Sequence, residues 1–212
     1  MTIAANLQTV RERIGHVGGN PDGITIVAVT KGFDAEVCRQ AVASGLTVLG
    51  ENRVLEALAK MPEVEGATWH LIGHLQTNKV KISFRQFDLI QTLDSLHLAE
   101  AIAHHNRTQK VLVEVNVARE PQRTGVSPEG AVELVAQAAT LVDVQGLMCM
   151  GPSQGDPAPA FDELRRLRDQ AQERLGNSLP ILSMGMSGDY EVAVKAGSTM
   201  LRLGTALFGP RP

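Results

Sequence analysis

The feature that most constrains the fold is a regular alternation of short apolar runs with longer segments of helical periodicity. Each run is rich in Val, Ile and Leu and has the length of a strand. Strands that alternate with helices favour a parallel sheet, and eight of them favour a closed (β/α)₈ TIM barrel over an open doubly wound sheet. The eight predicted strands cover residues 25–31, 47–52, 68–73, 89–94, 111–116, 144–150, 181–186 and 199–205.

An additional helix is predicted before the first strand. Its apolar stripe has three- and four-residue spacing, and it consists of Ile3, Leu7, Val10, Ile14 and Val17. With 212 residues the chain is near the lower size limit for such a barrel, and no low-complexity linker divides it. We therefore expect an α/β protein that forms one domain over residues 1–212.

Composition excludes several classes of partner. The formal net charge is −3, and no dense Lys/Arg tract suggests nucleic-acid binding. The N-terminus lacks a signal-peptide pattern, and no apolar run approaches the roughly 18 residues of a membrane helix. The spacing of Cys38 and Cys149 does not match a metal-ligand pair and is typical of reduced thiols. We expect a cytoplasmic monomer that binds neither nucleic acid nor a membrane.

The first strand runs into Lys31, the only lysine at the carboxyl end of such an apolar run. Active sites of barrels collect at that edge. Partial desolvation there lowers the pKa of a lysine and leaves a neutral amine that can attack a carbonyl. Lys31 is therefore a candidate Schiff-base lysine, and the alternative is a surface lysine at a strand end. By contrast, Lys110 falls at the N-terminal end of a strand, Lys195 falls within a helix, and Lys60 falls near a helix end.

Small and hydroxyl-bearing residues follow the seventh and eighth strands. Met186, Ser187 and Gly188 come after the seventh strand, and Gly204 and Thr205 close the eighth. Free backbone N–H groups and hydroxyls at these two places match the usual phosphate site of barrels. The separate alternatives are a helix N-cap at Ser187 and a turn glycine at Gly204.

A phosphate site opposite a reactive lysine suggests a phosphorylated aldehyde, either pyridoxal phosphate or a sugar phosphate of a lysine aldolase. Arg202 shares the side of the strand that carries Gly204, and a buried guanidinium there could donate to a pyridine nitrogen. The alternative is a surface salt bridge. An aldolase would need a nearby acid or base, and Tyr190, the only tyrosine, falls in a helix. His70 and His74 bracket a strand end, whereas i,i+4 metal ligands require a helix, so we expect no metal site.

Five motifs occur in the chain in an order that is specific to one family. They are Ala28-Val29-Thr30-Lys31, Gly50-Glu51-Asn52, the segment from Trp69 to Lys79, Met184-Gly185-Met186-Ser187-Gly188-Asp189, and the segment from Arg202 to Gly209. On these residues the chain resembles the pyridoxal phosphate homeostasis protein family, the single-domain relatives of the alanine racemase barrel.

The resemblance implies a set of site residues. Lys31 would hold pyridoxal 5′-phosphate as an internal aldimine, and Arg202 would face the ring nitrogen. The phosphate would be held by Ser187, Gly204 and Thr205 beside Gly188. Asn52 would line the pocket, with His70 and Met186 nearby.

Two positions depart from the family pattern. Many members carry Lys-Thr-Lys-Pro where this chain has Lys31-Gly32-Phe33, and many have a lysine where it has Arg123. Arginine keeps the charge but forms no stable Schiff base, so a role for a second lysine at either place is not expected.

The function implied by the resemblance is intracellular homeostasis or supply of pyridoxal phosphate, with apo forms of pyridoxal phosphate enzymes as partners and without strong catalytic turnover. The first alternative is an amino-acid racemase that uses the same cofactor. Racemisation needs a base on each face of the substrate, and in the two-domain racemases a second domain supplies the base that Lys31 does not. The second alternative is a lysine aldolase without cofactor.

Overall fold

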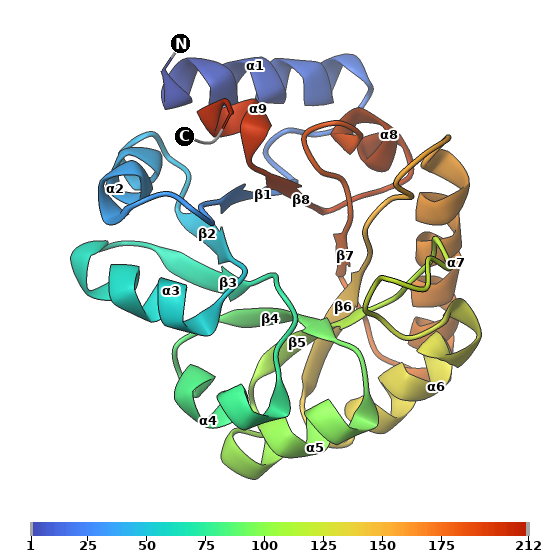
Figure 1. Cartoon of the computed structure of the whole chain (residues 1–212). Helices are drawn as coiled ribbons and strands as arrows, with labels where there is room; N and C mark the ends of the chain where they lie inside the picture. Colours follow the sequence, from blue (N-terminus) through green and yellow to red (C-terminus); the bar gives the residue numbers. More distant parts are fainter. Residues whose placement is uncertain (1, 211–212) are drawn as a thin grey trace.

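The computed structural model describes residues 2–210 and shows a closed eight-stranded barrel (Figure 1). The strands follow one another around the barrel in chain order, and β1 pairs with β8 to close it. Every pairing is parallel, as the alternation of strands and helices predicts. The strands are β1 (Thr25–Val29), β2 (Val48–Glu51), β3 (Thr68–Leu71), β4 (Leu89–Leu93), β5 (Lys110–Glu114), β6 (Asp143–Met148), β7 (Ile181–Ser183) and β8 (Met200–Leu203).

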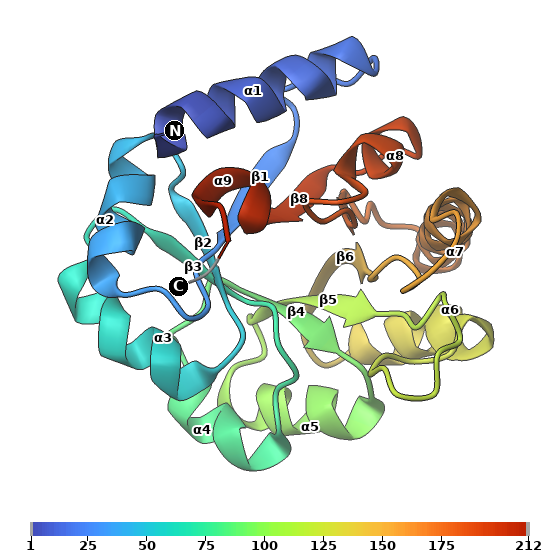
Figure 2. The same ribbon diagram turned by 45° about the horizontal axis from the view of Figure 1, so that its top comes forward.

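Helices surround the strands on the outside of the barrel (Figure 2). They are α1 (Ile3–His16), α2 (Ala35–Ala43), α3 (Val54–Lys60), α4 (Val80–Ser83), α5 (Leu96–His105), α6 (Pro128–Ala138), α7 (Ala158–Leu175), α8 (Tyr190–Lys195) and α9 (Thr205–Phe208), with 3₁₀ turns at Met61–Glu63 and Thr77–Lys79. The predicted single-domain α/β barrel is confirmed.

The predicted N-terminal helix is α1, which lies beside α9 at the end of the chain (Figure 1). The hydroxyl of Thr2 caps it by accepting a hydrogen bond from Ala5 N at 3.2 Å, a contact worth about 1 kcal/mol. Leu7, Val10 and Ile14 are buried, as their spacing predicts. Asn6 Nδ2 donates to Leu207 O at 2.7 Å and links α1 to α9, the first and last helices of the described chain.

The first strand ends earlier than predicted, which changes the setting of Lys31. β1 ends at Val29, and the next residues form a turn in which Phe33 N donates to Thr30 O at 3.1 Å. Gly32 occupies the third position of this turn with φ +77°, where glycine avoids the steric cost of a side chain. Lys31 therefore lies at the corner of a turn and not within the strand.

The apolar core has two parts. The larger part fills the space between the barrel and its helices. The smaller part lies inside the barrel and consists of Val27, Leu89, Leu112, Met148 and Met200. Above these five residues, towards the carboxyl ends of the strands, the interior of the barrel contains buried polar side chains.

Candidate functional site

A cavity of about 290 Å³ opens at the carboxyl ends of β1, β2 and β8 and at the loop after β7. Eight of the nine predicted site residues line it: Lys31, Asn52, Met186, Ser187, Gly188, Arg202, Gly204 and Thr205. Val29, Phe33, Ile72, Met150 and Gly209 complete the wall. Barrel closure brings these positions together although they are up to 180 residues apart in the chain, from Val29 to Gly209.

Ser187 joins the two loops that carry the predicted phosphate site. Its Oγ accepts hydrogen bonds from Gly204 N at 3.3 Å and from Ala206 N at 3.0 Å. The N-cap of α8 is Asp189, so the alternative of Ser187 as a plain N-cap is wrong. The hydroxyl instead holds the loop after β7 against the start of α9, with Thr205 exposed beside the cavity.

Arg202 extends from β8 into the interior of the barrel and reaches the cavity from below. Its Nη1 donates to Ser183 O at 2.8 Å and Ser183 Oγ at 2.7 Å, and its Nη2 donates to Cys149 O at 2.7 Å. The residue is buried, so the alternative of a surface salt bridge is wrong. Burial lowers the pKa of the guanidinium, which nevertheless stays protonated because its ordinary pKa exceeds 12.

A chain of hydrogen bonds leads from Arg202 to His70. Ser183 Oγ, which accepts from Arg202, donates to Gln91 Oε1 at 2.6 Å. The Gln91 amide nitrogen then lies 3.0 Å from His70 Nδ1. Burial lowers the pKa of His70 to about 4, so the ring is neutral near pH 7 and Nδ1 accepts the amide proton.

His70 is the predicted site residue that does not line the cavity. Ile72, two residues further along the chain, lines it instead. His70 is buried one layer deeper and supports Arg202 through Gln91 and Ser183. Sequence analysis missed Ser183 and Gln91, although both are polar residues within predicted apolar strands, which is a recognisable signal.

A larger hollow of about 610 Å³ adjoins the cavity and shares Asn52 with it. Its wall includes Arg53, His74 and Lys79. The hydroxyl and glycine loops of residues 186–188 and 204–205 line the smaller cavity only. The smaller cavity is therefore the better candidate for a phosphorylated ligand.

Neither a cluster of metal ligands nor a membrane-spanning helix occurs within residues 2–210. No group of three or more His, Cys, Asp or Glu side chains in that range is arranged to hold a metal ion. Within the same range, every helix is too short or too polar to cross a bilayer.

The arrangement suits a small phosphorylated aldehyde. Its volume of about 290 Å³ is close to the lower end of the roughly 300–1,000 Å³ typical of small-molecule sites. Lys31 offers an amine, backbone N–H groups and hydroxyls offer donors to an anion, and Arg202 adds a fixed positive charge.

A family model and a curated relative each match the whole chain. The model of the family "Alanine racemase, N-terminal domain" matches residues 1–212. A pyridoxal phosphate homeostasis protein from Aquifex aeolicus is 41% identical, and the alignment covers 100% of this chain and 99% of that protein.

Solved structures are also similar to this chain in fold and sequence. PipY of Synechococcus elongatus PCC7942, determined without PLP, is 33% identical with a TM-score of 0.88, over 98% of this chain and 100% of PipY. The same protein with PLP bound gives a TM-score of 0.86 at 33% identity, with the same coverage. An alanine racemase from Clostridium difficile is 18% identical with a TM-score of 0.77, which is a likeness of fold.

Proposed function

The chain belongs to the family of pyridoxal phosphate homeostasis proteins, and from this membership we propose that it binds pyridoxal 5′-phosphate in the cavity beside Lys31. The observation that carries the proposal is the convergence of eight predicted site residues on one cavity. The relative PipY has been solved with PLP bound, which supports the same ligand here.

In this proposal Lys31 forms the covalent attachment. Its neutral amine attacks the aldehyde carbon, a C=N bond forms, and the two amine hydrogens leave with the aldehyde oxygen as one water molecule. Arg202 approaches the cavity as a donor with no acceptor to offer. A donor at the ring nitrogen keeps that nitrogen unprotonated, whereas the electron-sink chemistry of this cofactor benefits from a protonated ring.

The phosphate is assigned to the loops that Ser187 holds together. Ser187 and Thr205 supply hydroxyls, and Gly188 supplies a backbone N–H group. Gly204 lines the same part of the cavity, and its own N–H donates to Ser187 Oγ. Hydrogen bonds to a charged acceptor are worth about 1.5–3 kcal/mol each. This part of the site therefore accounts for selection of the phosphate ester.

We propose a role in homeostasis or supply of the cofactor without strong catalytic turnover. Racemisation requires a base on each face of the substrate α-carbon. Among the side chains that line the cavity in residues 2–210, Lys31 is the only one that offers an amine, which serves as a base once it is deprotonated. Tyr190 is buried in α8 and is not part of the lining.

The proposed setting is a reducing compartment such as the cytoplasm. Cys38 and Cys149 are both buried free thiols, which is typical of proteins that stay reduced. The proposed partners beyond the cofactor are apo forms of pyridoxal phosphate enzymes, and the chain is proposed to act as a monomer. Size-exclusion chromatography with light scattering tests the last point.

Absorption and peptide mapping test the central proposal. Adding pyridoxal phosphate to the purified protein should produce a visible absorption band that Lys31→Ala lacks. Borohydride reduction followed by mass mapping should then place the cofactor on the peptide that contains Lys31. Attachment at Lys79 or Lys81, or an unchanged band in Lys31→Ala, would rule out the assignment.

A further inference from the structure

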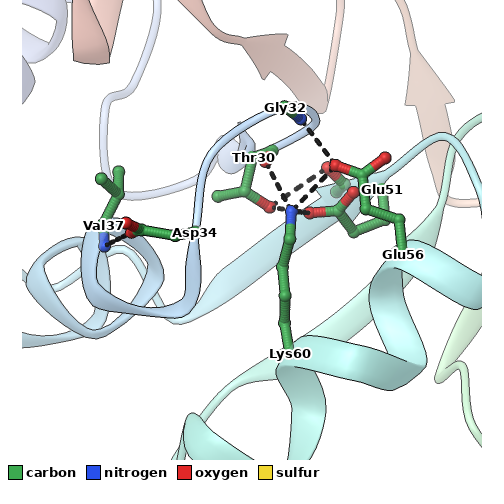
Figure 3. Close-up of polar contacts among 8 residues, drawn as sticks. Thr30, Gly32, Asp34, Val37, Glu51, Glu56 and Lys60 are labelled. Carbon is green, nitrogen blue, oxygen red and sulfur yellow. Dashed lines mark hydrogen bonds and ion pairs between the residues drawn. The ribbon is translucent and has the colours of Figure 1, made fainter.

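A buried cluster of charged side chains lies directly behind the turn that carries Lys31 (Figure 3). Lys60, the last residue of α3, donates from Nζ to Glu51 Oε1 at 2.8 Å and to Glu56 Oε1 at 3.0 Å. The Lys60 and Glu51 side chains are only 9% and 0% exposed. The Glu56 side chain is 27% exposed. Burying charged groups such as Glu51 and Lys60 is costly, so their position beside the candidate site calls for an explanation.

The cluster holds the backbone on both sides of Lys31. Before it, Thr30 O accepts from Lys60 Nζ at 3.0 Å. After it, Gly32 N donates to Glu56 Oε1 at 2.6 Å (Figure 3). The turn therefore cannot rotate without breaking a charge-assisted hydrogen bond at one side or the other.

A third contact fixes the side chain that precedes Lys31. Thr30 Oγ1 donates to Glu51 Oε1 at 2.6 Å, on the same oxygen that Lys60 reaches. Glu51, Glu56 and Lys60 come from β2 and α3, whereas Thr30 follows β1. The cluster thus ties the Lys31 turn to the neighbouring strand and helix of the barrel.

The contacts of Lys60 give it a different role from Lys31. Burial alone would lower the pKa of Lys60, but the bonds to Glu51 and Glu56 outweigh burial and raise the pKa. Its ammonium group donates to three acceptors. A protonated amine in this state is a hydrogen-bond donor and not a nucleophile.

We infer that Lys60, Glu51 and Glu56 are positioning residues that hold Lys31 where its amine can bond to an aldehyde. The inference rests on the proposed function, because it assumes that Lys31 carries the cofactor. Its competitor is a cluster that only stabilises the barrel. The two differ in one respect: a positioning cluster affects ligands that bond to Lys31, and a merely stabilising one affects all ligands of the cavity alike.

Two ligands with the same ring and phosphate separate these roles. Pyridoxal phosphate has the aldehyde, and pyridoxine phosphate has an alcohol in its place and cannot bond to Lys31. Glu56→Ala removes the acceptor of Gly32 N, whereas Glu56→Gln keeps an oxygen there. Glu63→Ala is the matched control, because Glu63 is 63% exposed and pairs with Arg39 on the surface.

Dissociation constants for both ligands are measured by fluorescence titration of the full chain, after circular dichroism confirms that each variant is folded. Glu56→Ala should bind pyridoxal phosphate about tenfold more weakly and pyridoxine phosphate within about twofold of the parent. Glu56→Gln should stay within about threefold for both ligands, and Glu63→Ala should match the parent. Equal weakening for both ligands, or no weakening for either, would overturn the inference.

A second variant tests Lys60 itself. Lys60→Met alone would leave Glu51 buried without its counter-charge and could unfold the barrel, so it is combined with Glu51→Gln. The double variant should show the same selective loss for pyridoxal phosphate, and full retention would contradict the positioning role.

Lys31→Ala distinguishes failure of the inference from failure of the proposed function. If Lys31→Ala leaves the preference for the aldehyde intact, the proposed function fails. If it removes that preference and Glu56→Ala does not reduce it, only the positioning role fails.

Discussion

Acidification should destabilise this protein through His70. The ring is buried, and its Nδ1 accepts a hydrogen bond from the Gln91 amide at 3.0 Å. Protonation would turn Nδ1 into a donor that faces another donor, and it would place a charge where burial lowers the pKa to about 4. The perturbation is therefore a change from pH 7.5 to about pH 5 in the absence of cofactor.

The magnitude follows from the two pKa values of His70. The pKa is about 6.5 in the unfolded chain and about 4 in the fold. Because the folded value is the lower one, the unfolded chain binds more protons between them, and stability falls as the pH decreases through 6.5 towards 4. By pH 5 this linkage removes about 2 kcal/mol of the free energy of unfolding.

Urea denaturation at both pH values measures this loss in the parent and in His70→Asn, with His97→Asn as the control on the exposed face of α5. Asparagine can still accept from Gln91 but does not titrate. Its variant should start less stable and lose about 2 kcal/mol less than the parent between the two pH values. Other titrating groups cancel in this difference. Equal losses in the parent and His70→Asn would refute the reasoning.

Three further predictions follow from the site. Pyridoxal should bind at least about tenfold more weakly than its phosphate ester, because the donors of residues 187–188 and 204–205 lose an anion; equal dissociation constants by fluorescence titration would argue against this phosphate site. L-Alanine should give no D-alanine above the blank in chiral chromatography, and turnover of about 1 per second or faster would show that the protein is an enzyme. Arg202→Met should lower the free energy of unfolding by about 2–4 kcal/mol, because Cys149 O loses its bond from the guanidinium and Ser183 loses two bonds, one to its carbonyl and one to its hydroxyl; a loss below about 1 kcal/mol in urea would contradict the buried role.

The sequence predicted the barrel and most of the cavity for the same reason. Buried parallel strands read as continuous Val/Ile/Leu runs, and their order alone places the carboxyl ends of β1, β2 and β8 around one opening. Lys31, Asn52 and Gly204 could therefore be assigned to a common site without knowledge of side-chain positions. The strand ends were less accurate, because a turn such as Thr30–Phe33 is defined by a hydrogen bond and not by hydropathy.

The depth at which each side chain lies inside the barrel could not be predicted from the sequence. His70 and Ile72 are two residues apart in an extended segment, so their side chains point to the same face. From the sequence, either one could line the cavity. The register of the barrel, in which His70 pairs with Gly50, determines that Ile72 reaches the cavity and His70 stays below.

The positioning cluster was only partly visible in the sequence. Glu56 and Lys60 have the i,i+4 spacing of a helical ion pair, but such pairs are usually on the surface. The contacts with Glu51 and Thr30 join three elements, so they depend on the packing of α3 against β1 and β2.

The distribution of buried polar side chains gives the cavity a physical explanation. Twelve polar or charged residues are buried in the described part of the chain, and seven of them belong to two networks. Three are in the cluster behind Lys31, namely Thr30, Glu51 and Lys60. Four are in the chain of hydrogen bonds from Arg202, namely Arg202, Ser183, Gln91 and His70.

A buried polar group destabilises a fold unless its partners are fixed, so a barrel selected for stability alone would have apolar residues at most of these places. Their concentration behind Lys31 and Arg202 instead fixes the Arg202 side chain and the backbone on both sides of Lys31, and both residues line the cavity. Within residues 2–210, the cavity lining offers an amine and a fixed cation but no second base, which agrees with the proposed role of holding a reactive aldehyde without strong turnover.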